Sequence, residues 1–73
     1  MPKNQHVIPH PEGWAVKGAG NERATSVHPT QQEAIITGRQ IAVNQGSELL
    51  VHGRNGQLRS RNSYGDDPYP PKG

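Results

Sequence analysis

One segment in the middle of the 73-residue chain carries the signals of a single α-helix. Thr30, followed three residues later by Glu33, fits a capping box, in which each side chain accepts a hydrogen bond from the other's backbone N–H. Gly46 suits the left-handed residue that ends a helix. The residues between them place one mostly apolar stripe on a helical face, made of Ala34, Ile35, Gly38, Ile41, Ala42 and Gln45. We predict a helix over residues 31–45, in which Gly38 lets the helix lie close to a sheet.

The segments on both sides of this helix have the β-branched, alternating character of strands. Residues 6–10, 14–17 and 23–28 predict a three-stranded meander, and residues 48–52 and 58–62 predict a hairpin. Asn55-Gly56 between the last two favours a type I′ turn, which needs positive φ at both central positions. The predicted fold class is α+β: β-β-β-α-β-β, with one antiparallel sheet and one helix packed on one face. The strands would add seven residues to the core, namely Val7, Trp14, Val16, Val27, Leu49, Val51 and Leu58.

The length and the proline distribution predict one domain with two extended ends. Residues 1–5 read as a flexible N-terminus, residues 6–63 as the folded domain, and residues 64–73, with three prolines, as an extended tail. Only 29% of the residues are hydrophobic, so the core of so small a domain is marginal. A sheet face left open by the single helix favours a homodimer.

Several classes of protein do not fit the composition. The chain has no cysteine, which excludes disulfides and thiolate chemistry, and a small secreted domain usually needs disulfides. We expect a cytoplasmic protein, with neither a signal peptide nor a membrane span.

The residue patterns also predict neither an enzyme nor a metal or cofactor site. His6 and His10 share strand parity but lie about 13 Å apart along a strand, too far to hold one ion. No zinc spacing, nucleophile motif or nucleotide-binding loop is present, and we expect no small-molecule substrate and no cofactor.

The C-terminal hairpin holds the clearest candidate binding surface. Arginines cluster on it, and Arg59 and Arg61 share one strand face by alternation, which is typical of a β-ribbon that contacts phosphates. The candidate nucleic-acid-binding residues are Lys17, His52, Arg54, Asn55, Arg59 and Arg61. The partner class would be DNA or RNA. The alternative interpretations are a solvated outer face, which protects a strand from aggregation, and a protein-interaction or accessory factor that uses the exposed sheet or the proline-rich tail.

A set of short motifs also resembles a known family. The motifs are His-Val-Ile-Pro, Gly-Trp-Ala-Val-Lys, Gln-Glu-Ala, Ile-Ala-Val-Asn-Gln, Leu-Leu-Val-His-Gly-Arg-Asn-Gly and Ser-Tyr-Gly-Asp-Asp-Pro. Together they resemble the short bacterial proteins called domain of unknown function 2188, over about residues 6–71. The resemblance implies a small bacterial protein, and no site residue comes with it.

Overall fold

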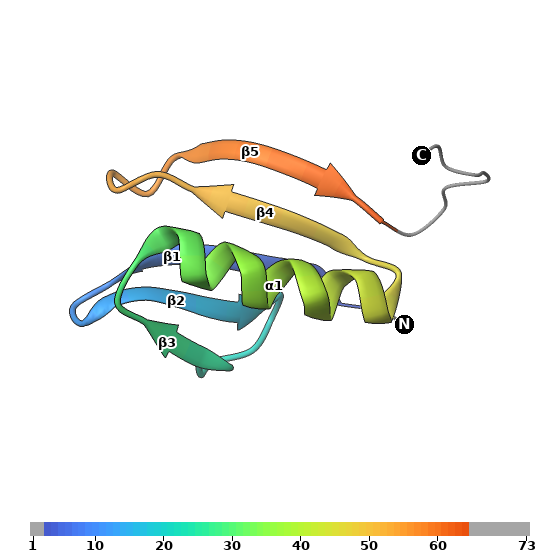
Figure 1. Ribbon diagram of the computed structural model, residues 1–73, viewed down its shortest axis with the longest axis horizontal. Helices are drawn as coiled ribbons and strands as arrows, with labels where there is room; N and C mark the ends of the chain where they lie inside the picture. Colours follow the sequence, from blue (N-terminus) through green and yellow to red (C-terminus); the bar gives the residue numbers. More distant parts are fainter. Residues whose placement is uncertain (1–2, 65–73) are drawn as a thin grey trace.

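The computed structural model describes residues 3–64, which form a five-stranded sheet with one helix across one face (Figure 1). In chain order the elements are β1 (Gln5–His10), β2 (Gly13–Gly18), β3 (Ser26–His28), α1 (Gln31–Gln45), β4 (Glu48–His52) and β5 (Leu58–Ser63). The α+β class, the element order and the bounds of the helix are confirmed. The third strand is shorter than the predicted residues 23–28. It begins at Ser26, and Arg23 lies in the preceding loop.

The sheet is mixed, with strand order β3-β2-β1-β4-β5. β1 pairs antiparallel with β2, β2 with β3, and β4 with β5, whereas β1 and β4 pair in parallel. The prediction of a purely antiparallel sheet is therefore wrong at this one pairing. The reason is the crossover through α1, which brings the chain back over the sheet before β4 begins, as parallel neighbours require.

The helix begins and ends where its capping residues stand. The Glu33 N–H donates to Thr30 Oγ1 (3.2 Å). Gly46 is left-handed (φ 65°), and the next N–H, of Ser47, donates to Ala42 O (2.9 Å). Gly38 does bring the helix close to the sheet, since a Cβ there would lie 2.9 Å from Leu49 Cδ1.

The core lies between α1 and the three middle strands. Its buried hydrophobic residues are Val7, Trp14, Val16, Ala34, Ala42, Leu49 and Val51, and Ile35, Ile41 and Tyr64 pack against them. Two predicted core residues are not there: Val27 is 40% exposed and Leu58 is 51% exposed. Both lie on edge strands, β3 and β5, and both point away from the helix, because their register partners, Ala15 and His52, lie on the face of the sheet opposite α1. Gln45, predicted on the buried helix stripe, is exposed near the end of α1.

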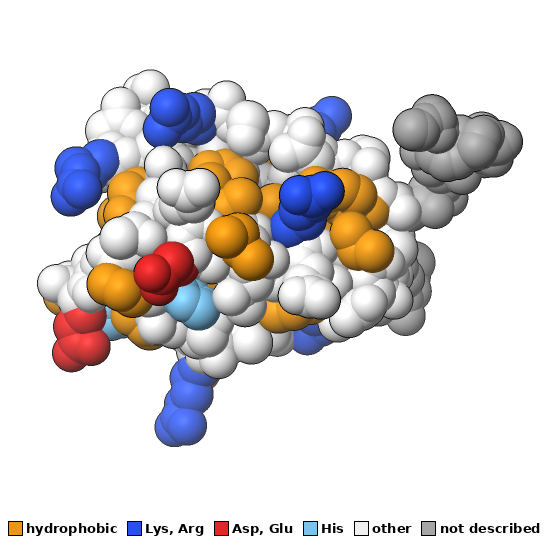
Figure 2. Space-filling view, viewed as in Figure 1, with side chains coloured by type: hydrophobic (Ala, Val, Ile, Leu, Met, Phe, Trp, Pro, Cys, Tyr) orange, Lys and Arg blue, Asp and Glu red, His pale blue; other side chains and the backbone are white. Residues whose placement is uncertain are grey.

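The outer side of α1 carries hydrophobic side chains of its own. Ile36 is 58% exposed and Val43 is 51% exposed, and Figure 2 shows hydrophobic groups on this side with a basic side chain among them. The helix is too short and too polar to cross a membrane, and it is the one helix that the structure describes.

The β4–β5 turn differs from the predicted type I′ turn. Gly56 has a positive φ of 86°, but no residue other than glycine does so within residues 3–64, and Asn55 is therefore not left-handed. The loop is instead longer: the Gly56 N–H donates to Gly53 O (2.9 Å), and the Gly53 N–H donates to Gln57 O (2.7 Å). A longer loop with glycine in the left-handed position is the next most common hairpin connection.

At the C-terminal end, Tyr64 packs against the core and its N–H donates to Ser47 O (3.0 Å). The ordered domain thus reaches at least this residue. Residues 65–73, the rest of the predicted tail, and residues 1–2 of the predicted N-terminal segment lie outside the described part of the chain.

Candidate functional site

Strand alternation shows which residues lie on the face of the sheet opposite α1, which we call the uncovered face. Val7, Val16 and Leu49 all point toward the helix, because the Cβ that Gly38 lacks would contact each of them. Their neighbours in sequence therefore point the other way. The uncovered face carries His6, Ile8, Ala15, Lys17, Leu50, His52 and Arg61.

The pairing registers align basic residues straight across this face. Lys17 on β2 is the register partner of His6 on β1, His6 is the partner of Leu50 on β4, and Leu50 is the partner of Arg61 on β5. We call Lys17, His6 and Arg61 the basic row. Because neighbouring strands lie about 4.8 Å apart, the row spans about 14 Å between its outer Cα atoms.

His52, on β4, lies beside the row and touches it. The rings of His6 and His52 stack with their centroids 5.2 Å apart, and His6 Nδ1 lies 3.0 Å from His52 Nε2. His52 Nδ1 lies 3.3 Å from Gly56 O, which can only accept. A consistent assignment has His52 donate from Nδ1 to this carbonyl and accept at Nε2 from His6 Nδ1.

The surroundings of His6 in the row change the pKa of its imidazole. Partial burial lowers this pKa below its usual 6.5, and the neighbouring His52 and Lys17 lower it further, because each disfavours a second positive charge. The three side chains line a shallow groove of about 570 Å³, together with the loop after β2. The lining of the groove includes both the cation Lys17 and the carboxylate of Glu22, which lies in that loop.

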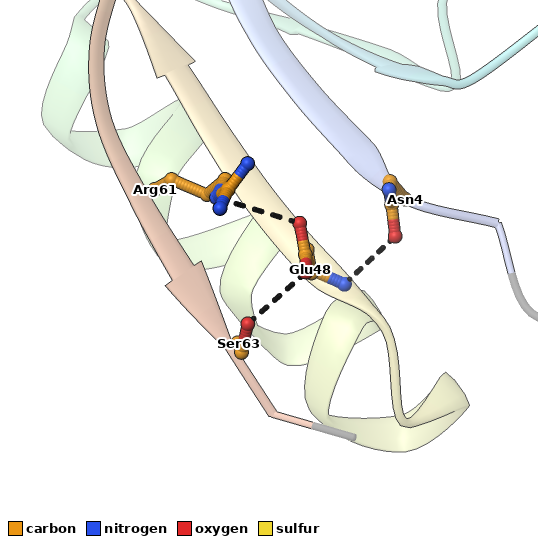
Figure 3. Close-up of polar contacts among 4 residues, drawn as sticks. All are labelled: Asn4, Glu48, Arg61 and Ser63. Atoms are coloured by element: carbon orange, nitrogen blue, oxygen red, sulfur yellow. Dashed lines mark hydrogen bonds and ion pairs between the residues drawn. The ribbon is translucent and has the colours of Figure 1, made fainter. Parts of the chain in front are cut away.

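Arg61 is the member of the row that forms an ion pair within residues 3–64. Its Nε lies 3.7 Å from Glu48 Oε1, and Ser63 Oγ donates to Glu48 Oε2 (3.2 Å), as Figure 3 shows. The Glu48 N–H donates to Asn4 Oδ1 (3.0 Å), which ties the start of β4 to β1. Because the Arg61 side chain is 61% exposed, this ion pair leaves the guanidinium open to a further anion.

The predicted common face of Arg59 and Arg61 is wrong, and the cause is a register shift. Val51 pairs with Ser60 but His52 pairs with Leu58, so Arg59 is an extra residue on β5. Arg59 Nη1 donates to Gln31 Oε1 at the start of α1 (3.3 Å). The Arg59 side chain therefore lies on the helix side of the sheet, and the Arg61 side chain lies on the uncovered face.

The structure thus divides five of the six predicted site residues between two surfaces and places the sixth in the β4–β5 turn. Lys17, His52 and Arg61 lie on the uncovered face, and Arg54 and Arg59 lie on the helix side in a groove next to Trp14. The Asn55 side chain is used by the turn itself, since its Oδ1 accepts from the Gln57 N–H (3.1 Å).

His6 is the functional candidate that sequence reasoning missed. It was compared with His10, its neighbour on the same strand, whereas its contact is His52, 46 residues away. The parallel pairing of β1 with β4 and its register make that contact, and the pattern within neither segment predicts them. His10 instead accepts from the Glu12 N–H at the β1–β2 turn (3.0 Å).

The contacts of the other histidines bear on two further kinds of site, a catalytic triad and a metal site. Ser26 Oγ lies 2.8 Å from His28 Nε2 on β3, but across residues 3–64 no carboxylate bonds to His28 as the third member of a triad would. Within the same residues, no three His, Asp or Glu side chains lie close enough together to hold a metal ion.

Comparisons with known proteins agree with the motifs in the sequence. The chain is 39% identical over 61 residues to uncharacterized protein YdaT of Bacillus subtilis (strain 168), a match that covers 84% of this chain and 41% of YdaT. The chain therefore spans less than half the length of that relative. No solved structure matches it significantly. Residues 5–64 match the family described as uncharacterized protein conserved in bacteria, domain of unknown function 2188. The chain belongs to this family of uncharacterized bacterial proteins.

Proposed function

We propose that the chain is a non-catalytic nucleic-acid-binding module, and that the uncovered face of the sheet is its binding surface. The observation that carries this proposal is the basic row: Lys17, His6 and Arg61 stand in register across four adjacent strands. The C-terminal hairpin contributes Arg61 and His52 to this surface, and the two N-terminal strands contribute the rest.

The chemistry of the surface favours contacts to phosphates over contacts to bases. Ammonium and guanidinium groups neutralise backbone phosphates whatever the sequence. The aromatic ring of Trp14 faces the helix and is only 6% exposed. Among the described residues of the uncovered face, the rings are the imidazoles of β1 and β4, of which those of His6 and His52 stack on each other. We therefore expect little sequence specificity.

Fluorescence anisotropy with labelled DNA and RNA, single- and double-stranded, tests this proposal. Binding should weaken as salt rises, with a slope of log K against log salt of about −0.7 per phosphate contacted in a single strand. The double variant Lys17→Ala/Arg61→Ala should lose most of the binding and most of the slope.

A matched control removes the same amount of charge elsewhere. Arg23→Ala/Arg39→Ala takes two exposed cations from the β2–β3 loop and from the outer side of α1, and it should bind like the natural chain. Binding that falls equally in both double variants would reflect net charge alone and would reject the uncovered face as the site. So would the absence of any binding at low salt.

A second candidate function, docking of a protein partner, has its own supporting observation. β5 is a six-residue edge strand without proline, exposed at every position. Such an edge has unpaired backbone groups that can accept another strand. A homodimer or a heterologous partner paired there would protect the outward backbone amides of β5 from hydrogen exchange. The predicted role of the proline-rich tail in such contacts lies outside the described residues.

A further inference from the structure

A second groove lies on the helix side of the sheet, away from the basic row. It has a volume of about 340 Å³ and is lined by Trp14, Pro29, Thr30, Gln31, Arg54 and Arg59. This volume is near the lower end of the ~300–1,000 Å³ of small-molecule sites. Figure 2, which views this side, shows Lys and Arg side chains gathered at the end where the β4–β5 turn lies.

The two arginines of this groove are each held in place by a protein group. The Arg54 guanidinium lies over the Trp14 ring, with Cζ 5.7 Å from the ring centroid, a cation–π contact. Arg59 donates to Gln31 Oε1 (3.3 Å), and the Gln31 amide in turn donates to His52 O (3.2 Å). A guanidinium that is already oriented loses less entropy when it binds a ligand.

The register shift on β5 is what brings Arg59 here. Without the extra residue, alternation would place Arg59 on the same face as Arg61. A bulge that re-aims one side chain is a common feature near binding sites. In this chain the bulge adds a second cation to a groove that already holds Arg54.

The charges that line the groove are not balanced locally. None of its six lining residues is acidic, and the one ion pair formed within residues 3–64 joins Arg61 to Glu48 on the other face. Arg54 and Arg59 are thus left to bind an anion from outside. Guanidinium groups match the oxygens of phosphate better than ammonium groups do, because their planar fork donates two parallel hydrogen bonds.

We propose that this groove, which we call the Trp14 groove, binds a phosphomonoester, with Arg54 and Arg59 contacting the terminal phosphate. The apolar edge of the groove, formed by Trp14 and Pro29, would contact the organic group that carries the phosphate. The site is separate from the basic row and does not rest on the proposed nucleic-acid binding.

The fluorescence of Trp14 tests the proposal directly, because it is the chain's single tryptophan. Titration with AMP and with inorganic phosphate at low salt should change this fluorescence saturably, and adenosine should not change it. Isothermal titration calorimetry then compares the variants without relying on the ring. Arg54→Ala and Arg59→Ala should each weaken AMP binding about tenfold or more, and Arg59→Lys should weaken it less, because the charge remains and the fork is lost.

Arg61→Ala is the matched control, since it removes an arginine from the same strand but from the opposite face. It should bind AMP like the natural chain. Equal binding of adenosine and AMP, or AMP binding that survives in both Arg54→Ala and Arg59→Ala, would overturn the proposal. A failure to bind AMP and phosphate at all would also overturn it. Circular dichroism confirms that each variant is folded, and Arg59→Lys serves if Arg59→Ala is not.

The phosphate could belong to a free small molecule or to the end of a nucleic acid. An oligonucleotide with a 5′-phosphate that binds more tightly than the same oligonucleotide with a 5′-hydroxyl, with the advantage lost in Arg54→Ala, would assign the groove to strand ends. Equal binding of the two, with AMP binding intact, would assign it to free phosphomonoesters. In either case the variant Lys17→Ala/Arg61→Ala should leave AMP binding unchanged, which separates the groove from the basic row.

Discussion

β4 and β5 are paired strands of nearly equal length, but their side chains differ strongly in burial. Along β4, Leu49 and Val51 are buried and alternate with partly exposed residues, whereas all six residues of β5 are exposed. The helix accounts for the difference, since α1 packs on β1, β2, β3 and β4 and contacts β5 little. A strand in this fold gains a buried side only where the single helix covers it.

The comparison divides the molecule into a stabilising part and a part free to bind. Burial of apolar side chains under α1 supplies most of the favourable free energy of folding. β5 contributes little burial, and its side chains can therefore be charged without a desolvation cost. The uncovered face combines exposed basic side chains with a fixed strand register. The packing of the opposite face of the sheet against α1 holds that register.

Removal of a large side chain from each strand should give the largest contrast. Leu49→Ala leaves a cavity beneath α1 and should lower the free energy of unfolding by about 2–5 kcal/mol. Leu58→Ala, on the exposed edge strand, should change it by less than about 0.5 kcal/mol. Urea denaturation followed by circular dichroism measures both. Similar losses in the two variants would mean that β5 shares in the core after all.

Gly38→Ala tests how closely the helix lies on the sheet. The new Cβ would lie 2.9 Å from Leu49 Cδ1 and 3.4 Å from Val7 Cγ2, and both residues are fully buried. Overpacking of about 1–3 kcal/mol should exceed the gain of about 1 kcal/mol in helix propensity. The free energy of unfolding should fall modestly, by denaturant titration. A rise to the full propensity gain would show that the helix can move away from the sheet.

The pKa of His6 predicts that the domain is less stable in mild acid. The folded-state pKa is lowered by burial, His52 and Lys17, so below about pH 6.5 the unfolded chain binds more protons than the folded one. Stability should be fully present above that pH and should be lost as the pH falls toward the lowered value. His6→Gln should flatten this dependence, measured as urea midpoints at several pH values, and His10→Gln should keep it. A natural chain whose stability rises in mild acid would contradict the assignment.

The smallest effect expected is that of Glu48, the ion-pair partner of Arg61. Glu48→Gln removes the partner of Arg61 (3.7 Å), and exposed pairs of this kind contribute about 0–1 kcal/mol. Nucleic acid should bind about twofold more tightly, because Arg61 is released, while stability changes little. Anisotropy titration measures it, and weaker binding would mean that Glu48 orients Arg61 productively.

The parts of the fold that sequence reasoning predicted well are those with local causes. The helix bounds follow from Thr30, Glu33 and Gly46, which act within a turn of the helix ends, and the close approach at Gly38 follows from its missing side chain. Strand segments were recognised from alternation. The errors have non-local causes. The parallel pairing of β1 with β4 depends on the path of the crossover, and the exposure of Val27 and Leu58 depends on the strand registers that place them on the uncovered face.

In the candidate site, too, features with local causes were predictable from the sequence and features with non-local causes were not. Basic side chains are visible in the sequence, but whether they meet is decided by strand register. One extra residue on β5 separates Arg59 from Arg61, and the pairing of distant strands joins His6 to His52. No pattern within either segment contains that information, because each register is set by two strands together.

The central claim is that nucleic acid binds the uncovered face, and the histidine ring signals test it most directly. His6 and His52 lie on that face, whereas His28 pairs with Trp14 on the helix side. In a ¹H–¹³C NMR titration with a short single-stranded oligonucleotide, the ring signals of His6 and His52 should shift together and saturably while those of His28 stay in place. A shift of His28 with no change at His6 and His52 would contradict the account and move the site to the other face.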